Sequence, residues 1–158
     1  FATSIYENLR VAKASLTREE AVTSLQRAGL GEWIDSLPDG IDTVIGSGAT
    51  TVSGGERRRL LMARALLVPA PVMAVDEASE HLDGETADRL MNTLLTPPPD
   101  RATLVVTHRL SALDQADQVL VVGRAQDGQC ARVVAQGTHA HVLSCLPGYR
   151  WALDQEEQ

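Results

Sequence analysis

The sequence predicts an α/β fold in which helices cover a parallel sheet. Three short apolar runs, at residues 72–75, 102–106 and 118–122, have the length and composition of strands. We expect a helix between the last two runs, beginning near Ser111. Strand, helix and strand at this spacing favour a parallel sheet within one domain.

A helix is indicated well before the first of these strands. Thr17 and Glu20 have the form of a capping box ahead of an apolar helical repeat. We therefore expect a helix over about residues 17–28 that ends near Gly29. Residues 41–51 are rich in Gly, Thr and Ser, and this composition predicts a loop.

Two more helices flank the first strand. One should open on the Gly-Gly pair at 54–55 and stop before Pro69, because proline disfavours helix in the residue before it. Asp83 is placed to cap the other helix, which the three prolines at 97–99 close. Its apolar stripe consists of Ala87, Leu90, Met91, Leu94 and Leu95.

The end of the chain reads as a hairpin followed by helices. Asp127-Gly128 lies between residues 119–122 and Val133-Val134, which suggests two antiparallel strands around a turn. From Thr138 onward the apolar spacing predicts two short helices, split at Pro147-Gly148.

Composition narrows the class of protein. The 158 residues are 44% hydrophobic, enough for a single domain or part of one. A formal charge of −7 argues against a nucleic-acid partner, since the basic cluster at 57–59 is short. Cys130 and Cys145 lack metal-ligand spacing and are expected to be free thiols in a reducing cytoplasm. No apolar run approaches the roughly 20 residues that span a bilayer.

Three motifs carry the chemical signal. Val-Ser-Gly-Gly-Glu at 52–56 opens a helix, so bare backbone N–H groups and the positive end of a helix dipole face a possible phosphate. The strand over residues 72–75 is apolar on both sides and ends in Asp76 and Glu77. A second apolar strand runs to Thr107 and is followed by His108. Ligands of open α/β folds gather at such carboxyl ends of strands.

In this order and spacing, the motifs resemble the signature motif, Walker B strand and switch histidine of ATP-binding cassette (ABC) ATPases. The resemblance implies a P-loop NTPase-type α/β domain, but the chain has no stretch of the form G-x-x-x-x-G-K-[ST], the phosphate-cradling Walker A loop. The chain also begins at Phe1, in a segment like the one that follows the family's glutamine-bearing loop. We therefore expect the carboxy-terminal portion of a nucleotide-binding domain, inactive by itself.

Within that portion we expect three parts. Residues 1–69 would form the helical and signature region, and residues 70–137 would hold the parallel-sheet catalytic core with the terminal hairpin. Residues 138–158 would form C-terminal helices.

The resemblance also implies roles for individual residues. Asp76 would hold Mg²⁺, usually through water, and Glu77 would act as general base on the attacking water. His108 would bond the γ-phosphate and keep the water and glutamate in place. The plain alternatives are two solvated acids at a strand end and a structural or solvated histidine.

The signature is implied to act in trans, on ATP bound by a second nucleotide-binding domain. Ser53 and the backbone of Gly54 and Gly55 would contact the γ-phosphate, since glycine lets backbone approach closely. Val52 and Glu56 replace the more frequent leucine and glutamine. The alternative for this motif is only a helix start behind a flexible loop.

Asp83 corresponds to the aspartate that links the two ATP sites of a dimer, although capping its own helix is an alternative that does not exclude this role. Ser47 stands where exporters usually have a glutamate that contacts the coupling helices of the membrane domains. Coupling could therefore be weaker or use other contacts.

The exporter type is the nearest likeness, with transmembrane domains upstream in the same chain and a location at the cytoplasmic face of the cell membrane. The opening segment, the signature and the stretch at 76–83 look most like bacterial heterodimeric exporters of cysteine or glutathione that support cytochrome bd assembly. Two other interpretations stay open: a soluble cassette ATPase of DNA repair or translation, and a non-hydrolysing partner that lends its signature to an active subunit.

Overall fold

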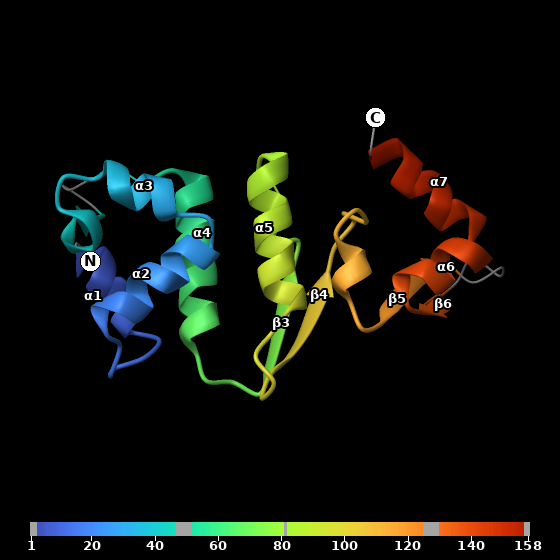
Figure 1. Cartoon of the computed structure of the whole chain (residues 1–158), viewed down its shortest axis with the longest axis horizontal. Helices are drawn as coiled ribbons and strands as arrows, with labels where there is room; N and C mark the ends of the chain where they lie inside the picture. The colour runs from blue at the N-terminus through green and yellow to red at the C-terminus, as the bar shows by residue number, and fades with distance from the viewer. Residues whose placement is uncertain (1–2, 47–51, 81, 125–129, 157–158) are drawn as a thin grey trace.

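The structure is a computed structural model that describes residues 3–46, 52–80, 82–124 and 130–156. In Figure 1, helices α1 to α4 form one end of the molecule, α5 with β3 and β4 the middle, and β5, β6, α6 and α7 the other end. The elements of the first end are β1 (Thr3–Ser4), α1 (Ile5–Arg10), α2 (Arg18–Arg27), α3 (Gly31–Ser36), a 3₁₀ turn η1 (Gly40–Asp42), β2 (Val44–Ile45) and α4 (Gly54–Leu67).

The remaining elements are β3 (Val72–Asp76), α5 (Gly84–Leu95), β4 (Ala102–Val106), a 3₁₀ turn η2 (Leu113–Gln115), β5 (Val119–Arg124), β6 (Ala131–Gly137), α6 (His139–Cys145) and α7 (Pro147–Glu156). Among the described residues, no helix has the length and hydropathy of a membrane span. Both cysteines are free and exposed. That these cysteines are in a reducing cytoplasm stays a prediction.

Helix starts follow the capping signals in the sequence. The Thr17 side chain accepts a hydrogen bond from the Glu20 backbone, and the Glu20 side chain accepts one from the Thr17 backbone, which confirms the capping box of α2. This helix ends at Arg27, and Gly29 beyond it has φ +74°, a conformation that suits glycine. Helix α4 stops before Pro69 as predicted.

The prediction of a loop over residues 41–51 is wrong in its first part. Residues 40–42 form η1, and β2 pairs antiparallel with β1. Two apolar side chains in this stretch, Ile41 and Ile45, are buried in the main core and draw the backbone into regular structure. Residues 47–51, including Ser47, lie outside the described residues.

The parallel sheet forms at β3 and β4, whose register pairs Val72 with Ala102 and Asp76 with Val106. One face packs through Met73, Val75 and Val105 against the main core, to which α5 contributes Leu90 and Leu94. The other face leaves apolar side chains exposed: Val72, Leu104 and Val106. The strand that is apolar on both sides is thus covered on only one side by the described residues.

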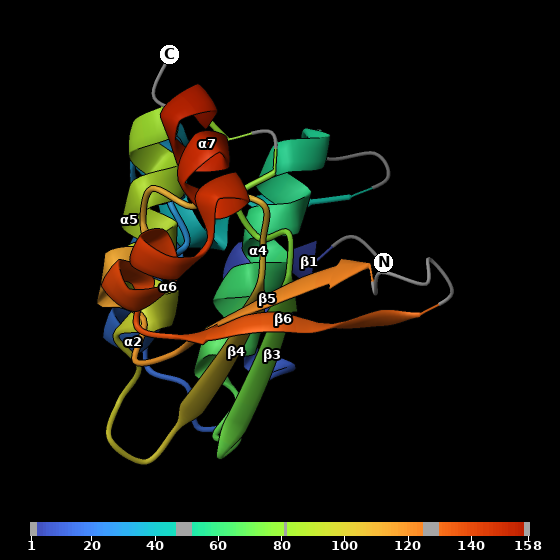
Figure 2. The same cartoon turned by 90° about the vertical axis from the view of Figure 1, so that its right-hand side faces the viewer.

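The predicted parallel arrangement of residues 102–106 with 118–122 is wrong. Strand β5 pairs antiparallel with β6, with an irregularity at Val121/Val122, and its partner among the described strands is not β4. The expected helix near Ser111 is only the 3₁₀ turn η2, too short to carry the chain back along the sheet. In Figure 2 the β5–β6 hairpin runs across the direction of β3 and β4.

The hairpin itself is confirmed, although its predicted turn at Asp127-Gly128 lies outside the described residues. Two C-terminal helices are also confirmed, with α7 beginning at Pro147. They close a second core around the following buried residues: Met91, Ala112, Leu113, Val119, Val142 and Tyr149. Helix α5 therefore lies between the two cores, with Leu90 in one and Met91 in the other.

Candidate functional site

The acid pair lies at the carboxyl end of the parallel sheet. Asp76 is the last residue of β3 and is exposed. The backbone N–H of Glu77 donates to the carbonyl of Val106 at 2.9 Å, which fixes Glu77 beside the end of β4. Glu77 has φ +48°, a left-handed conformation that is uncommon for a residue with a side chain. The backbone therefore turns sharply at Glu77, directly after Asp76 at the end of β3.

His108 meets Glu77 across the ends of the two strands. The distance between His108 Nδ1 and Glu77 Oε2 is 2.7 Å, with the histidine side chain 78% exposed and the glutamate side chain 34% exposed. The same oxygen is shielded from solvent and has no aligned hydrogen-bond donor among the described residues. We therefore describe the contact as a close approach of two polar groups, which becomes an ion pair when the imidazole is protonated.

The residues predicted to form the signature, 52–56, lie at the start of α4. Ser53 accepts a hydrogen bond from the Glu56 backbone at 3.2 Å, and the Glu56 carboxylate accepts one from the Ser53 backbone at 2.8 Å. Val52 packs against the main core. A Cβ added to Gly54 would meet nothing within 4 Å, so packing within the chain does not require glycine there. The backbone at Gly54 is open to a group from outside.

Asp83 caps helix α5, as predicted. Its Oδ1 accepts from the backbone N–H of Thr86 at 2.9 Å, and this hydrogen bond holds the pKa of Asp83 below its usual value. Its contact with a second domain stays a prediction. Glu80, three residues earlier, approaches Arg58 of the signature helix at 2.9 Å, and His81 lies outside the described residues.

The structure thus brings Asp76, Glu77 and His108 together at one edge of the sheet. Sequence reasoning missed two residues that hold the loop behind His108, namely Arg109 and Glu156. Arg109 could have been noticed as the neighbour of His108. Glu156 gives no local signal, because it lies 46 residues along the chain from the backbone amide of Leu110 that it contacts.

The family resemblance of the sequence predicts Mg²⁺ at Asp76. Within the part of the chain that the structure describes, no three His, Cys, Asp or Glu side chains gather as a group that could hold a metal ion. Mg²⁺ commonly keeps several waters and binds one or two carboxylates together with substrate phosphates. The exposed carboxylate of Asp76 at the sheet edge fits that mode of binding.

Comparison with known proteins identifies the family. Residues 2–80, half of the chain, match the family model of the ABC transporters. The ATP-dependent lipid A-core flippase of Pseudoalteromonas atlantica is 40% identical over 133 residues, which make up 84% of this chain and 22% of the flippase. The mitochondrial potassium channel ATP-binding subunit of Rattus norvegicus is 38% identical over 143 residues, 90% of this chain and 19% of that protein.

Among solved structures, a bacterial Atm1-family ABC exporter with ATP bound superimposes on the whole chain with a TM-score of 0.77 and 28% identity, over 27% of the exporter's length. The chain belongs to the ABC transporter family. Within that family it is similar to nucleotide-binding domains of the exporter type. It spans about a fifth of the length of the curated relatives described above.

Proposed function

We propose that this chain is the portion of an ABC exporter's nucleotide-binding domain that directs ATP hydrolysis. The observation that carries the proposal is the 2.7 Å approach of His108 to Glu77 at the carboxyl end of a parallel sheet. Carboxyl ends of parallel strands are where open α/β folds bind ligands. An acid and a histidine in contact there suit the activation of water beside a phosphate.

Glu77 is the general base in this proposal. Its backbone is fixed by the bond to Val106, and its side chain is half-buried, so the carboxylate has a defined position from which to accept a proton from water. His108 contacts Glu77 from the side and is exposed enough to reach a γ-phosphate at the same time. Its role is to position and stabilise charge, which is the main contribution of protein groups in phosphoryl transfer.

Asp76 would hold Mg²⁺, and the ion would neutralise charge on the phosphates as it develops. Asp76 precedes Glu77 directly, so the bend at Glu77 would let one strand end serve both functions.

The signature at residues 52–56 would act on the nucleotide of a second nucleotide-binding domain. Ser53 already satisfies the N–H of Glu56, whereas the backbone around Gly54 is open, which supports phosphate contact through backbone N–H groups. Asp83 would link the two ATP sites from the start of α5.

The rest of the domain would supply the phosphate-binding loop and cover the exposed apolar face of β3 and β4. A continuous face with Val72, Leu104 and Val106 exposed supports this, since soluble proteins rarely leave such strands open. Transmembrane domains would lie upstream in the same polypeptide, as befits a chain that spans a fifth of its relatives. The domain would then work at the cytoplasmic face of the membrane, and residues 1–158 alone would not hydrolyse ATP.

For cargo, we propose a thiol compound such as cysteine or glutathione, on the sole basis that the segments at 4–9, 52–59 and 76–83 resemble those of bacterial thiol exporters; these segments are not expected to contact the cargo themselves. Transport by the full-length protein into inverted vesicles, with radiolabelled glutathione and a labelled lipid as separate substrates, tests this choice. ATP-dependent uptake of the lipid alone would contradict it.

The hydrolysis proposal is tested with Glu77→Gln in the full-length protein. The amide keeps the shape of the side chain but cannot accept the proton, so we expect ATP binding to persist while kcat falls by about 10² to 10⁴-fold. Asp100→Asn is the matched control, because it removes the same charge from an exposed turn at the opposite end of β4. Normal hydrolysis by Glu77→Gln would exclude Glu77 as the base. Absence of hydrolysis in the wild-type protein with any partner would favour a non-hydrolysing regulatory domain.

A further inference from the structure

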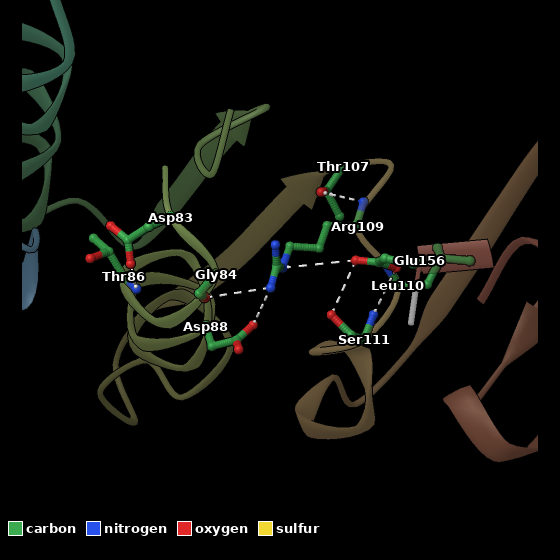
Figure 3. Close-up of polar contacts among 9 residues, drawn as sticks. All are labelled: Asp83, Gly84, Thr86, Asp88, Thr107, Arg109, Leu110, Ser111 and Glu156. Atoms are coloured by element: carbon green, nitrogen blue, oxygen red, sulfur yellow. Dashed lines mark hydrogen bonds and ion pairs between the residues drawn. The ribbon is translucent and has the colours of Figure 1, made fainter. Parts of the chain in front are cut away.

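The loop that follows His108 is held by the last turn of helix α7. Figure 3 shows the carboxylate of Glu156 facing the backbone of Leu110 and Ser111, with Arg109 between this contact and the start of α5. The three residues 109–111 come directly after the histidine of the candidate site. The position of these three residues therefore affects where the backbone places His108.

Glu156 makes a dense set of contacts for a residue near the chain end. Its Oε2 accepts from the backbone N–H of Leu110 at 2.7 Å and of Ser111 at 3.2 Å. Its Oε1 accepts from the Ser111 hydroxyl at 3.1 Å. One carboxylate thus takes three hydrogen bonds, and charge-assisted bonds of this kind are stronger than neutral ones.

Arg109 connects the loop after His108 to helix α5. Its Nη2 lies 2.7 Å from Oδ1 of Asp88 and 3.5 Å from the carbonyl of Gly84, at the first turns of the helix that Asp83 caps. Its Nε is shielded from solvent without an aligned acceptor among the described residues, and Oε1 of Glu156 is 3.8 Å away. The Arg109 and Glu156 side chains are only 24% and 23% exposed.

Further contacts hold both sides of the contact between Glu156 and the loop. Helix α7 is seated in the second core by buried Tyr149, whose hydroxyl lies 2.9 Å from Nδ1 of His139. On the other side, the backbone N–H of Arg109 donates to the Thr107 hydroxyl at 3.0 Å, which closes a turn around His108. The histidine is therefore at the tip of a turn whose far side is fastened to α7.

We propose that Glu156 is a positioning residue for hydrolysis, through which α7 fixes the turn that presents His108 to Glu77. Arg109 connects this support to the start of α5, so that displacement of α7 also disturbs the helix behind Asp83. The inference rests on the proposed role of His108. It adds that the C-terminal helix takes part in setting the rate, although it touches no reacting atom.

The test uses the full-length protein with Glu156→Ala and Glu156→Gln, beside Asp154→Asn as control. Asp154 is an exposed acid on the same helix, so its replacement removes the same charge without freeing the loop. Because misplacement of a catalytic group by about 1 Å can lower a rate by up to 10²-fold, we expect kcat of Glu156→Ala to fall on the order of 10-fold. KM for ATP should change less than kcat, because in the proposed function most phosphate contacts lie in the phosphate-binding loop that the rest of the domain would supply. Glu156→Gln keeps an acceptor oxygen and should recover part of the rate.

Hydrogen exchange at the amides of Leu110 and Ser111 gives a readout independent of turnover. We expect faster exchange at both in Glu156→Ala, because they lose their acceptor. Faster exchange with unchanged kcat would overturn the inference, as would an equal loss of kcat in Asp154→Asn. If Glu156→Ala fails to fold, an unchanged kcat in Glu156→Gln with faster-exchanging amides overturns it equally. Hydrolysis by Glu77→Gln would instead reject the proposed function, so the two failures are distinguishable.

Discussion

The helical region, residues 3–46 and 52–67, and the sheet of β3 and β4 differ in the burial of their apolar side chains. In the helical region Leu9, Leu25 and Leu30 are almost completely buried among neighbouring helices. In the sheet, every second residue is exposed, including large apolar ones such as Val72 and Leu104. The candidate catalytic side chains, Asp76, Glu77 and His108, nevertheless lie at the end of this sheet. The difference teaches that the stable part of this chain and its candidate reaction centre are separate, and that contacts between them must hold the centre in place.

The largest expected effect tests the packing side of this comparison. Leu25→Ala should lower the free energy of unfolding by about 2 to 5 kcal/mol, because it leaves a cavity in a filled core. Val72→Thr, on the exposed face of β3, should change it by less than about 0.5 kcal/mol while that face is uncovered. Urea denaturation of both variants measures the contrast. Equal losses would mean that the face of β3 is covered in solution.

A glycine at the junction of the two regions gives the next effect. Gly29 has φ +74°, and an added Cβ would lie 2.7 Å from Cγ2 of Thr86 in α5. Gly29→Ala should cost about 2 to 4 kcal/mol, from backbone strain and overpacking together. Gly40 has φ +49° with nothing within 4 Å, so Gly40→Ala should show the strain alone, about 1 to 2 kcal/mol. Thermal unfolding of the pair separates the two causes, and identical losses would show that Thr86 moves aside freely.

Arg101 joins the regions through hydrogen bonds. Its guanidinium donates to the carbonyls of Leu66 and Ala70 at 3.2 Å each, and also to that of Val68, at the end of α4. Arg101→Met should lower stability by about 1.5 to 3 kcal/mol, because these carbonyls lose a charged donor. Arg89→Met is the control, since the ion pair of Arg89 with Glu85 is exposed and long, at 3.8 Å. Chemical denaturation that gave the same small loss for both would reduce Arg101 to a surface contact.

The smallest effect concerns the cap at the site end of α5. The bond from Thr86 lowers the pKa of Asp83 from 3.8, so the charged cap stabilises the fold above that value and loses its effect as pH falls through the lower folded pKa. Asp83→Asn also caps but does not titrate. We expect equal unfolding midpoints at neutral pH, and a steeper decline for the wild type below about pH 4. Parallel curves between about pH 5 and pH 3 would contradict the assignment of this shift to Asp83.

The sequence predicted features that depend on neighbours three or four residues apart. The capping box of Thr17 with Glu20 and the cap at Asp83 are such features, and α2 and α5 begin beside them. Ser53 and Glu56 form a capping box with the same spacing at the start of α4, where the sequence predicts only a helix start. The parallel strands were also predictable, since apolar runs that end in polar residues have few other interpretations. Asp76, Glu77 and His108 were predicted as site residues because each of them lies at the carboxyl end of one of these strands.

The structural features that could not be predicted from the sequence depend on residues far apart in the chain. The pairing of β5 with β6 rather than β4 is decided by the shortness of η2, which a propensity argument does not reveal. Strand β2 forms because it meets β1, about 40 residues earlier. Glu156 is an ordinary surface acid in the sequence, and only the folding of α7 places it beside Ser111.

The left-handed backbone at Glu77 has an evolutionary consequence. A residue with a long side chain at φ +48° carries about 1 to 2 kcal/mol of strain, whereas asparagine adopts this region more readily. Random drift under selection for folding alone would therefore move this position away from glutamate. In a related protein that no longer hydrolyses ATP, replacement of this glutamate would relieve the strain and increase stability. The identity of residue 77 among relatives would therefore indicate which of them still need the acid.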